Sequence, residues 1–361
     1  MAHIMTVRGP IPPDELGLTS MHEHVLWSGR VYRERYLSLL PEDPEVHADD
    51  EVALENLSAH MRNYVLTWDG VSMHDEEVMR QEVSEFKTSG GSAMVDMSTP
   101  GLRSNLPGIR RISEETGVHI ITTTGLYAED SWPQEYAQMG QDEYRDYMKD
   151  EIDNGIAGTG IGPGHLKIAI TDLTVQQERL LRAAVHVSNE TGYSLTVHPG
   201  YIIGSDGRRI VKIMKEEGMR LERAIIAHTQ AFFTPNDFRA LVTKPESWTL
   251  NLDYARELLD QGANLSVECF GQNWNLELRG FVMQTDWQRM AGVLALIKEG
   301  YSPQLVLGTD TFLKIVTRRY GGEGYCRLTE FVLPTLKEFG VSDFDLRQIT
   351  IENPPCLLAI E

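Results

Sequence analysis

Two histidines stand two positions apart in the segment Met21-His22-Glu23-His24. Side chains at positions i and i+2 of a β-strand point to the same side, so His22 and His24 can approach one metal ion together. Imidazole nitrogens are common ligands of zinc. On this pair alone, a metal site and a pair of polar residues at the rim of a sheet are equally favoured.

Further ionisable residues stand at the ends of other apolar runs. His198, His228 and Asp310 each close such a run, and Lys167 lies within one, among apolar neighbours. A single buried histidine is more often a hydrogen-bonded core residue than a ligand, and a lysine in a strand can extend its amine to solvent. Four histidines and an aspartate are a stronger indication, because the carboxyl ends of barrel strands form the active face. Chance accounts easily for one such residue and poorly for five.

The elements that position these residues alternate along most of the chain. Amphipathic stretches at Glu76–Ser89, Leu173–Thr191 and Gln288–Glu299 predict helices. Short apolar runs predict buried parallel strands at Leu18–His24, Ser92–Asp96, His119–Tyr127, His165–Thr171, Ser194–His198, Ala224–His228, Asn264–Cys269 and Gln304–Asp310. This alternation predicts an α/β fold, a single (β/α)8 TIM barrel over residues 1–361, rather than the two domains that the length alone suggests.

Residues 27–75 are the longest departure from this alternation. They hold acidic clusters and a predicted helix near Val52–Tyr64. A long loop insertion after the first strand lies over the active face of a barrel, which favours a lid or a part of a dimer contact. A solvated surface loop is the alternative. Residues 1–5 resemble a cloning remnant, so His3 is left out of the candidate site.

Composition narrows the classes of partner and compartment. The 361 residues include 33 Lys plus Arg and 53 Asp plus Glu, a formal net charge of −20. Such a surface repels phosphate backbones and anionic lipids, so we expect a small-molecule substrate and neither nucleic-acid nor membrane partners. Three widely spaced cysteines without a CxxC pair argue against a disulfide framework. With no signal peptide or membrane-spanning stretch visible, we expect a cytoplasmic protein.

The order of these motifs resembles the phosphotriesterase-related branch of the amidohydrolase superfamily. The resemblance covers nearly the whole chain, from Gly9-Pro10-Ile11-Pro12 and His22-Glu23-His24, through Gly125-Leu126-Tyr127, Lys167, His198 and His228, to Asp310 and Glu352-Asn353-Pro354. It implies a site for two divalent metal ions, zinc first, with manganese, cobalt or iron as alternatives. In that reading His22, His24 and Asp310 hold the more buried ion, while His198 and His228 hold the more exposed one.

The resemblance also implies roles for two further residues and for Asp310. Lys167 would bridge both ions as a carbamate formed with carbon dioxide, which requires a desolvated, neutral amine. A hydroxide shared by the ions would attack the substrate, and Asp310 would accept its proton. Tyr127 matches a tyrosine that lactonases of this branch place near the bridging water; packing at the barrel rim is the alternative. Relatives are often dimers, so we expect a homodimer.

Two departures bear on the substrate. The segment after His228 lacks the aspartate common in relatives, and Glu268-Cys269 stands where acyl-lactone hydrolases have Asp-Arg. Loop aromatics predict an apolar pocket lined by some of Trp27, Trp132, Phe232, Phe233, Phe270, Trp274, Phe281 and Phe312. Four cations could meet an anionic substrate group, although surface solvation is the alternative for most of them: Arg279, Lys314, Arg318 and Arg319.

The resulting hypothesis is a binuclear metal-dependent hydrolase of a lactone or carboxyl ester, with promiscuous phosphotriesterase activity. The alternatives are an amide hydrolase acting on an N-acyl amino compound and a dedicated organophosphate hydrolase. A nonenzymatic metal- or ligand-binding protein is least favoured, because both Asp310 and Lys167 are present. A Rossmann dehydrogenase is excluded, because the glycine-rich segment 158–164 precedes a predicted strand instead of following one.

Overall fold

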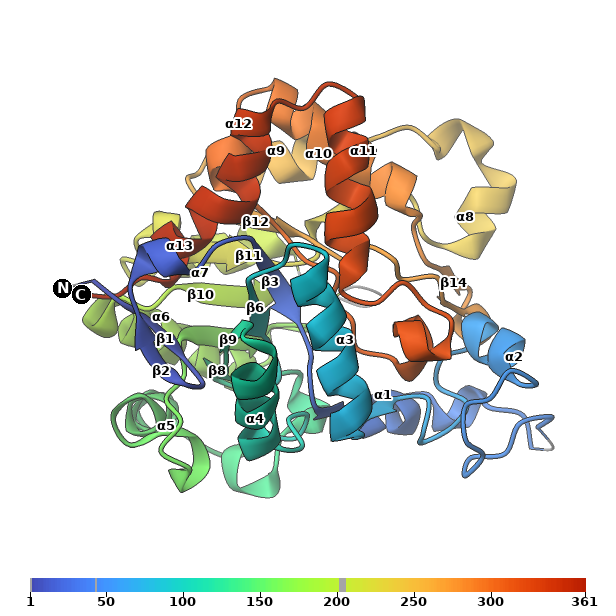
Figure 1. Ribbon diagram of the computed structural model, residues 1–361, viewed down its shortest axis with the longest axis horizontal. Helices are drawn as coiled ribbons and strands as arrows, with labels where there is room; N and C mark the ends of the chain where they lie inside the picture. The colour runs from blue at the N-terminus through green and yellow to red at the C-terminus, as the bar shows by residue number, and fades with distance from the viewer. Residues whose placement is uncertain (1, 43, 201–205) are drawn as a thin grey trace.

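A parallel sheet of six strands forms the centre of the computed structural model, which describes residues 2–42, 44–200 and 206–361 (Figure 1). Its strands lie in the order β15-β12-β11-β10-β9-β8. Their bounds are Thr123–Thr124 (β8), His165–Ala169 (β9), Leu195–His198 (β10), Ala224–Ile226 (β11), Asn264–Val267 (β12) and Leu305–Leu307 (β15). A second parallel sheet has the order β3-β6-β7, with bounds Thr19–Glu23 (β3), Ala93–Asp96 (β6) and His119–Ile121 (β7).

The two sheets adjoin at both edges. Only Thr122 separates β7 from β8, so the predicted strand His119–Tyr127 is divided between the sheets. At the other edge, the Asp310 N–H donates to the His22 carbonyl at 2.9 Å, which brings the segment after β15 beside β3. Gly308 permits this approach, because a Cβ there would lie 2.8 Å from the His22 nitrogen and oxygen. Every predicted strand is present, and the predicted α/β fold is confirmed.

Helices surround the strands and bury their apolar faces against them (Figure 1). In α6, for example, Leu180, Leu181 and Ala184 share a buried cluster with Val197 of β10. Thr174 caps this helix by accepting the Gln177 N–H at 3.1 Å. The helices after the insertion are α3 (Glu76–Thr88), α4 (Leu106–Thr116), α5 (Gln141–Asn154), α6 (Val175–Thr191), α7 (Gly207–Glu216), α8 (Phe238–Thr243), α9 (Asp253–Leu259), α10 (Asp286–Lys298), α11 (Leu333–Glu338), α12 (Asp343–Arg347) and α13 (Asn353–Leu358).

The insertion is a packed part of the fold. It holds α1 (Arg30–Arg35) and α2 (Leu57–Arg62), and the antiparallel pair β4 (Trp27–Ser28) and β5 (Ser72–Met73) closes its base. Trp27, Tyr64, Val65 and Val71 are buried. The predicted helix near Val52–Tyr64 is shorter than expected: the Val52 and Ala53 N–H groups donate to the side chains of Asp69 and Asn56 instead of entering a helix.

The N-terminal segment also belongs to the fold. A hairpin of β1 (Ile4–Thr6) and β2 (Gly9–Ile11) packs Ile4 into the core, and the His3 N–H donates to the Ile360 carbonyl at 2.8 Å. A second hairpin pairs β13 (Asn275–Leu276) with β14 (Phe281–Val282). Across the described part of the chain, none of the helices combines the length and the apolar character needed to cross a membrane.

Candidate active site

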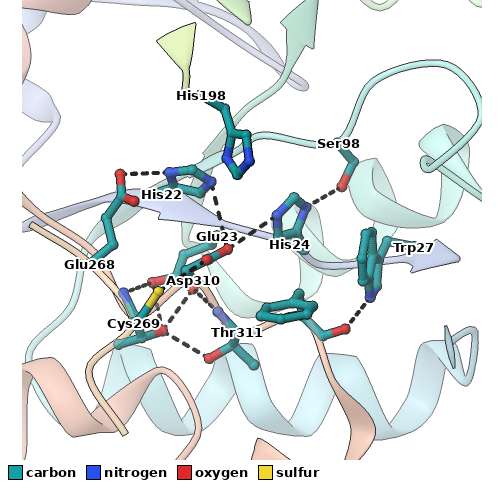
Figure 2. Close-up of polar contacts among 12 residues, drawn as sticks. His22, Glu23, His24, Trp27, Ser98, His198, Glu268, Cys269, Asp310 and Thr311 are labelled. Atoms are coloured by element: carbon teal, nitrogen blue, oxygen red, sulfur yellow. Dashed lines mark hydrogen bonds and ion pairs between the residues drawn. The ribbon is translucent and has the colours of Figure 1, made fainter. Parts of the chain in front are cut away.

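His22 and His24 face the same side of β3 and its continuation, as the spacing predicts (Figure 2). Their Nδ1 atoms are held from outside: His22 Nδ1 lies 2.7 Å from Glu268 Oε1, and His24 Nδ1 lies 2.9 Å from Ser98 Oγ. Both Nε2 atoms face Asp310 Oδ1, at 3.6 Å from His22 and 3.3 Å from His24. Because Glu268 and Ser98 hold the Nδ1 atoms, Nε2 of each ring points toward Asp310.

Asp310 is held in place by Glu23, which lies between the two histidines in sequence. Glu23 accepts the backbone N–H of Thr309 at 2.8 Å and that of Thr311 at 3.0 Å, the residues on either side of Asp310. Burial raises the pKa of the Glu23 carboxyl to about 7. Sequence reasoning missed this role, because Glu23 and Thr309 lie far apart along the chain.

Glu268 at the end of β12 joins two histidines from other strands. Its Oε1 faces His22 Nδ1, and its Oε2 lies 2.8 Å from Nδ1 of His228 and 3.1 Å from the His228 backbone nitrogen. Burial alone would raise the pKa of this fully buried carboxyl, but the two imidazoles hold it well below its usual range. The role of Glu268, left open by the sequence, is to orient both rings.

His198 and His228 lie with ring centroids 4.4 Å apart, and His228 lies 5.1 Å from His22. His198 differs from the other rings in its polar contact, because its Nε2 faces the Tyr127 hydroxyl at 3.1 Å. Cys269 follows Glu268 and donates from Sγ to Asp310 Oδ2 at 3.3 Å. The ends of β3, β10, β11, β12 and β15 thus all contribute to one cluster.

Lys167 completes this cluster from β9. Its side chain is 1% exposed, and its Nζ has no hydrogen-bond partner among the described residues. Burial lowers the pKa of the amine to about 8, although Glu268 and Asp310 act in the opposite direction. A buried amine without a partner is costly unless it is neutralised or bound.

The residues present fit a divalent metal centre. Three ligand atoms lie within 4.8 Å of one another, one each from His22, His228 and Asp310, and all three side chains are buried. Imidazole nitrogens and a carboxylate suit zinc and related ions, and second partners such as Glu268 and Ser98 fix the ligand rings. The orphaned Lys167 amine fits conversion to an anionic ligand in the same place.

A cavity of about 570 Å³ lies over this cluster and is lined by all seven predicted site residues: His22, His24, Tyr127, Lys167, His198, His228 and Asp310. Of the predicted aromatic lining, only Trp274 and Phe312 are found among the described cavity residues. Besides Tyr127, three tyrosines of the insertion also line the cavity: Tyr32, Tyr36 and Tyr64. The sequence could have predicted these three tyrosines as cavity residues, because they lie in a segment expected to cover the active face.

The cations expected from the sequence lie elsewhere. None of Arg279, Lys314, Arg318 and Arg319 lines the described cavity. Lys314 pairs with Asp69, and Arg318 pairs with Glu85 at 3.1 Å. Sequence reasoning instead missed Arg35, which lines the cavity and pairs with Asp130 at 2.7 Å. Of the two roles considered for these four cations, their absence from the described cavity lining favours surface solvation over contact with substrate.

A parallel α/β fold with buried histidines, a lysine and an aspartate at its strand ends defines the class: the protein is a member of the amidohydrolase superfamily. Within it, the chain belongs to the phosphotriesterase family, whose sequence model matches residues 2–358. Enzymes of this family are binuclear metal hydrolases. The resemblance inferred from the motifs is confirmed.

Individual relatives span the chain as well. An N-acetyltaurine hydrolase from Salmo salar is 27% identical over 354 residues, covering 97% of this chain and 96% of the relative. The crystal structure of a resiniferatoxin-binding protein from Rhodobacter sphaeroides has a TM-score of 0.87 and 28% identity, covering 99% of this chain and 94% of that one. A lactonase from Listeria monocytogenes shares the fold with a TM-score of 0.77 at 20% identity, covering 99% of each chain.

Proposed function

We propose that this protein is a metal-dependent hydrolase of a lactone or carboxyl ester with an apolar or aromatic portion. The observation that carries the proposal is the convergence of all seven predicted site residues on one aromatic-walled cavity. His22, His24 and Asp310 would hold one ion and His198 and His228 the other, with Lys167 between them as a carbamate. When bound, two divalent ions activate water as a nucleophile at neutral pH and polarise the acyl oxygen of the substrate.

The chain's own residues move protons and orient groups around that reaction. Asp310 is the proton acceptor, because its carboxylate points into the cluster and its flanking backbone is fixed by Glu23. Glu268 holds the Nδ1 atoms of His22 and His228, so that Nε2 is the nitrogen of each ring that would bind an ion. Tyr127 lines the cavity and presents a hydroxyl to the bound substrate.

The charges around the cavity favour a neutral substrate. Glu129, Asp130 and Asp172 line it together with the aromatic wall. Arg35, apart from Lys167 the only Lys or Arg among the described lining residues, already gives a bidentate pair to Asp130. An anionic substrate would have to separate that pair, whereas a neutral ester or lactone need not. Neutral phosphotriesters meet the same condition, which supports them as a side activity.

An amide hydrolase acting on an N-acyl amino compound is the second candidate. It is favoured by the relatives named N-acetyltaurine hydrolase, which match this chain at 26–27% identity over at least 96% of their own length. Ester and amide hydrolysis develop the same oxyanion, so the residues around Asp310 serve both. Arg35 is the residue on which the two candidates differ, because an acidic amino portion would need its guanidinium.

The test begins with removal of metal by a chelator and restoration with zinc or manganese. We expect hydrolysis of a panel of lactones, aryl esters, N-acyl amino acids, N-acetyltaurine and organophosphates to be abolished and then restored. Undiminished hydrolysis by the stripped protein would rule out a metal-dependent reaction. A preference for N-acetyltaurine over every ester and lactone would replace the first candidate with the second.

Arg35→Met separates the candidates within one protein. It should retain hydrolysis of neutral esters to a greater degree than hydrolysis of anionic amides, because only the latter require the cation. Arg279→Met is the matched control, since Arg279 is exposed and lies outside the described cavity lining. The control should leave the ratio of the two rates at its wild-type value.

Light scattering on the same preparations tests the predicted homodimer.

A further inference from the structure

A second phenol reaches the cavity from the insertion. Tyr32 lies on α1, and its hydroxyl donates to the Tyr127 hydroxyl at 2.6 Å. The Tyr127 hydroxyl in turn lies 3.1 Å from His198 Nε2. Both tyrosines line the cavity. The three side chains therefore form a continuous line of polar contacts from the insertion to a predicted metal ligand.

A second link fastens α1 beside this contact. Arg35, three residues after Tyr32, donates from Nε and Nη2 to the two carboxylate oxygens of Asp130, both at 2.7 Å. Asp130 likewise lies three residues after Tyr127. Two residues of α1 therefore contact two residues of the segment after β8, each pair three positions apart. The Tyr32 ring also packs against Phe312, with centroids 5.8 Å apart. These contacts hold the Tyr32 hydroxyl at one position against Tyr127.

The hydrogen-bonding capacity of Tyr127 then decides where its proton points. A phenol has one proton to donate and can accept further hydrogen bonds. Because His198 Nε2 faces Tyr127, Nδ1 is the nitrogen left for an ion, and a neutral imidazole bound through Nδ1 carries its proton on Nε2. Tyr32 and His198 would then both donate to the Tyr127 oxygen. The proton of Tyr127 is left for a third partner in the cavity.

We infer that Tyr32 is a positioning residue, which fixes Tyr127 as a hydrogen-bond donor to the bound substrate. The inference rests on the proposed function and adds to it a residue outside the strand-end cluster. The insertion would then not only line the cavity but also orient Tyr127 for contact with the substrate. Tyr32 would act only through Tyr127, and this dependence makes the inference testable.

The test compares Tyr32→Phe, Tyr127→Phe and the double variant as zinc-loaded proteins of measured zinc content. Each change removes a hydroxyl and keeps the ring. The readouts are kcat/KM for 4-nitrophenyl phenylacetate and the Kd of phenylacetate, the acid released from that ester. We expect Tyr32→Phe to weaken both about fivefold, the size of one hydrogen bond, and Tyr127→Phe to weaken both by more. The double variant should match Tyr127→Phe within about twofold.

Tyr64→Phe is the matched control, because it removes the same group from the same wall, where its ring lies 4.4 Å from Trp274. Its effect should add to that of Tyr127→Phe. Additive effects of Tyr32→Phe and Tyr127→Phe, or wild-type values in Tyr32→Phe, would overturn the role of Tyr32 while ester hydrolysis by the wild type upholds the proposed function. A wild type that neither binds phenylacetate nor hydrolyses any ester would overturn the proposed function, and the role of Tyr32 with it.

Discussion

Glu268→Gln tests whether one buried carboxylate sets the protonation of two candidate metal ligands. Glu268 accepts from His22 Nδ1 on one oxygen and from His228 Nδ1 on the other, at 2.7 and 2.8 Å. Glutamine of the same shape has one oxygen and one NH2 group, so one imidazole must face a donor. That ring gains from moving its proton to Nε2, the nitrogen that would bind an ion.

The magnitude follows from the loss of one hydrogen bond to a charged group, about 1.5–3 kcal/mol. Since about 1.4 kcal/mol corresponds to a factor of ten in an equilibrium constant, zinc affinity should fall about 10–100-fold. The range measured for other proteins when the partner of a ligating histidine is changed is the same, about 10–100-fold. Titration of metal-free protein with zinc against a chromophoric chelator measures the effect.

Glu82→Gln is the control for a general effect of the substitution on the fold. Glu82 is 4% exposed and also uses both oxygens, accepting the backbone N–H of Arg318 at 3.0 Å and that of Arg319 at 2.9 Å. Its replacement should lower the free energy of unfolding and leave zinc affinity at the wild-type value. Zinc affinity within about threefold of wild type in folded Glu268→Gln would refute the orienting role of Glu268.

Three further changes probe the same centre. Lys167→Ala should lose bound zinc and hydrolysis, with partial recovery on adding small carboxylic acids; retention of two zinc ions by mass spectrometry would contradict the bridging role. Ser98→Ala removes the neutral partner of His24 Nδ1 and should weaken zinc binding up to about tenfold in the same titration, less than the loss of a charged partner. Gly308→Ala should cost about 1–3 kcal/mol in urea unfolding, because its Cβ would press on the backbone of β3. Gly162→Ala, whose Cβ would meet Met5 at an ordinary 3.5 Å, should cost less than Gly308→Ala; equal costs would contradict the close approach.

The parts of the fold and site that the sequence predicted are those with local causes. Short apolar runs predicted every parallel strand, and the order of His22, Lys167, His198 and Asp310 predicted which strand ends meet. A run of apolar residues does not show at which residue the chain stops pairing with one sheet and begins to pair with another. The division of the predicted strand His119–Tyr127 between two sheets was therefore beyond the sequence.

The residues that the sequence did not predict act through contacts between distant segments. In the sequence, Glu268 is a single acidic residue that follows an apolar run, and its two imidazole partners come from other strands. Tyr32 and Arg35 lie in an insertion without the regular alternation of strands and helices, so nothing in their spacing shows which loop they cover. Their roles follow from the parallel contacts with Tyr127 and Asp130.

The backbone at the site shows why strand-end residues converge so closely. His228, Cys269 and Asp310 have positive φ angles of 55°, 64° and 48°, three of the five non-glycine residues with this conformation in the described ranges. Each costs about 1–3 kcal/mol and persists only where surrounding contacts fix it. Such contacts are present: Glu268 accepts the His228 N–H, and Cys269 donates to Asp310. The chain turns two or three residues beyond the ends of three neighbouring strands, β11, β12 and β15, which directs the side chains toward one another. The cluster is therefore maintained at a cost in backbone energy, as expected of a site selected for its chemistry and not for stability alone.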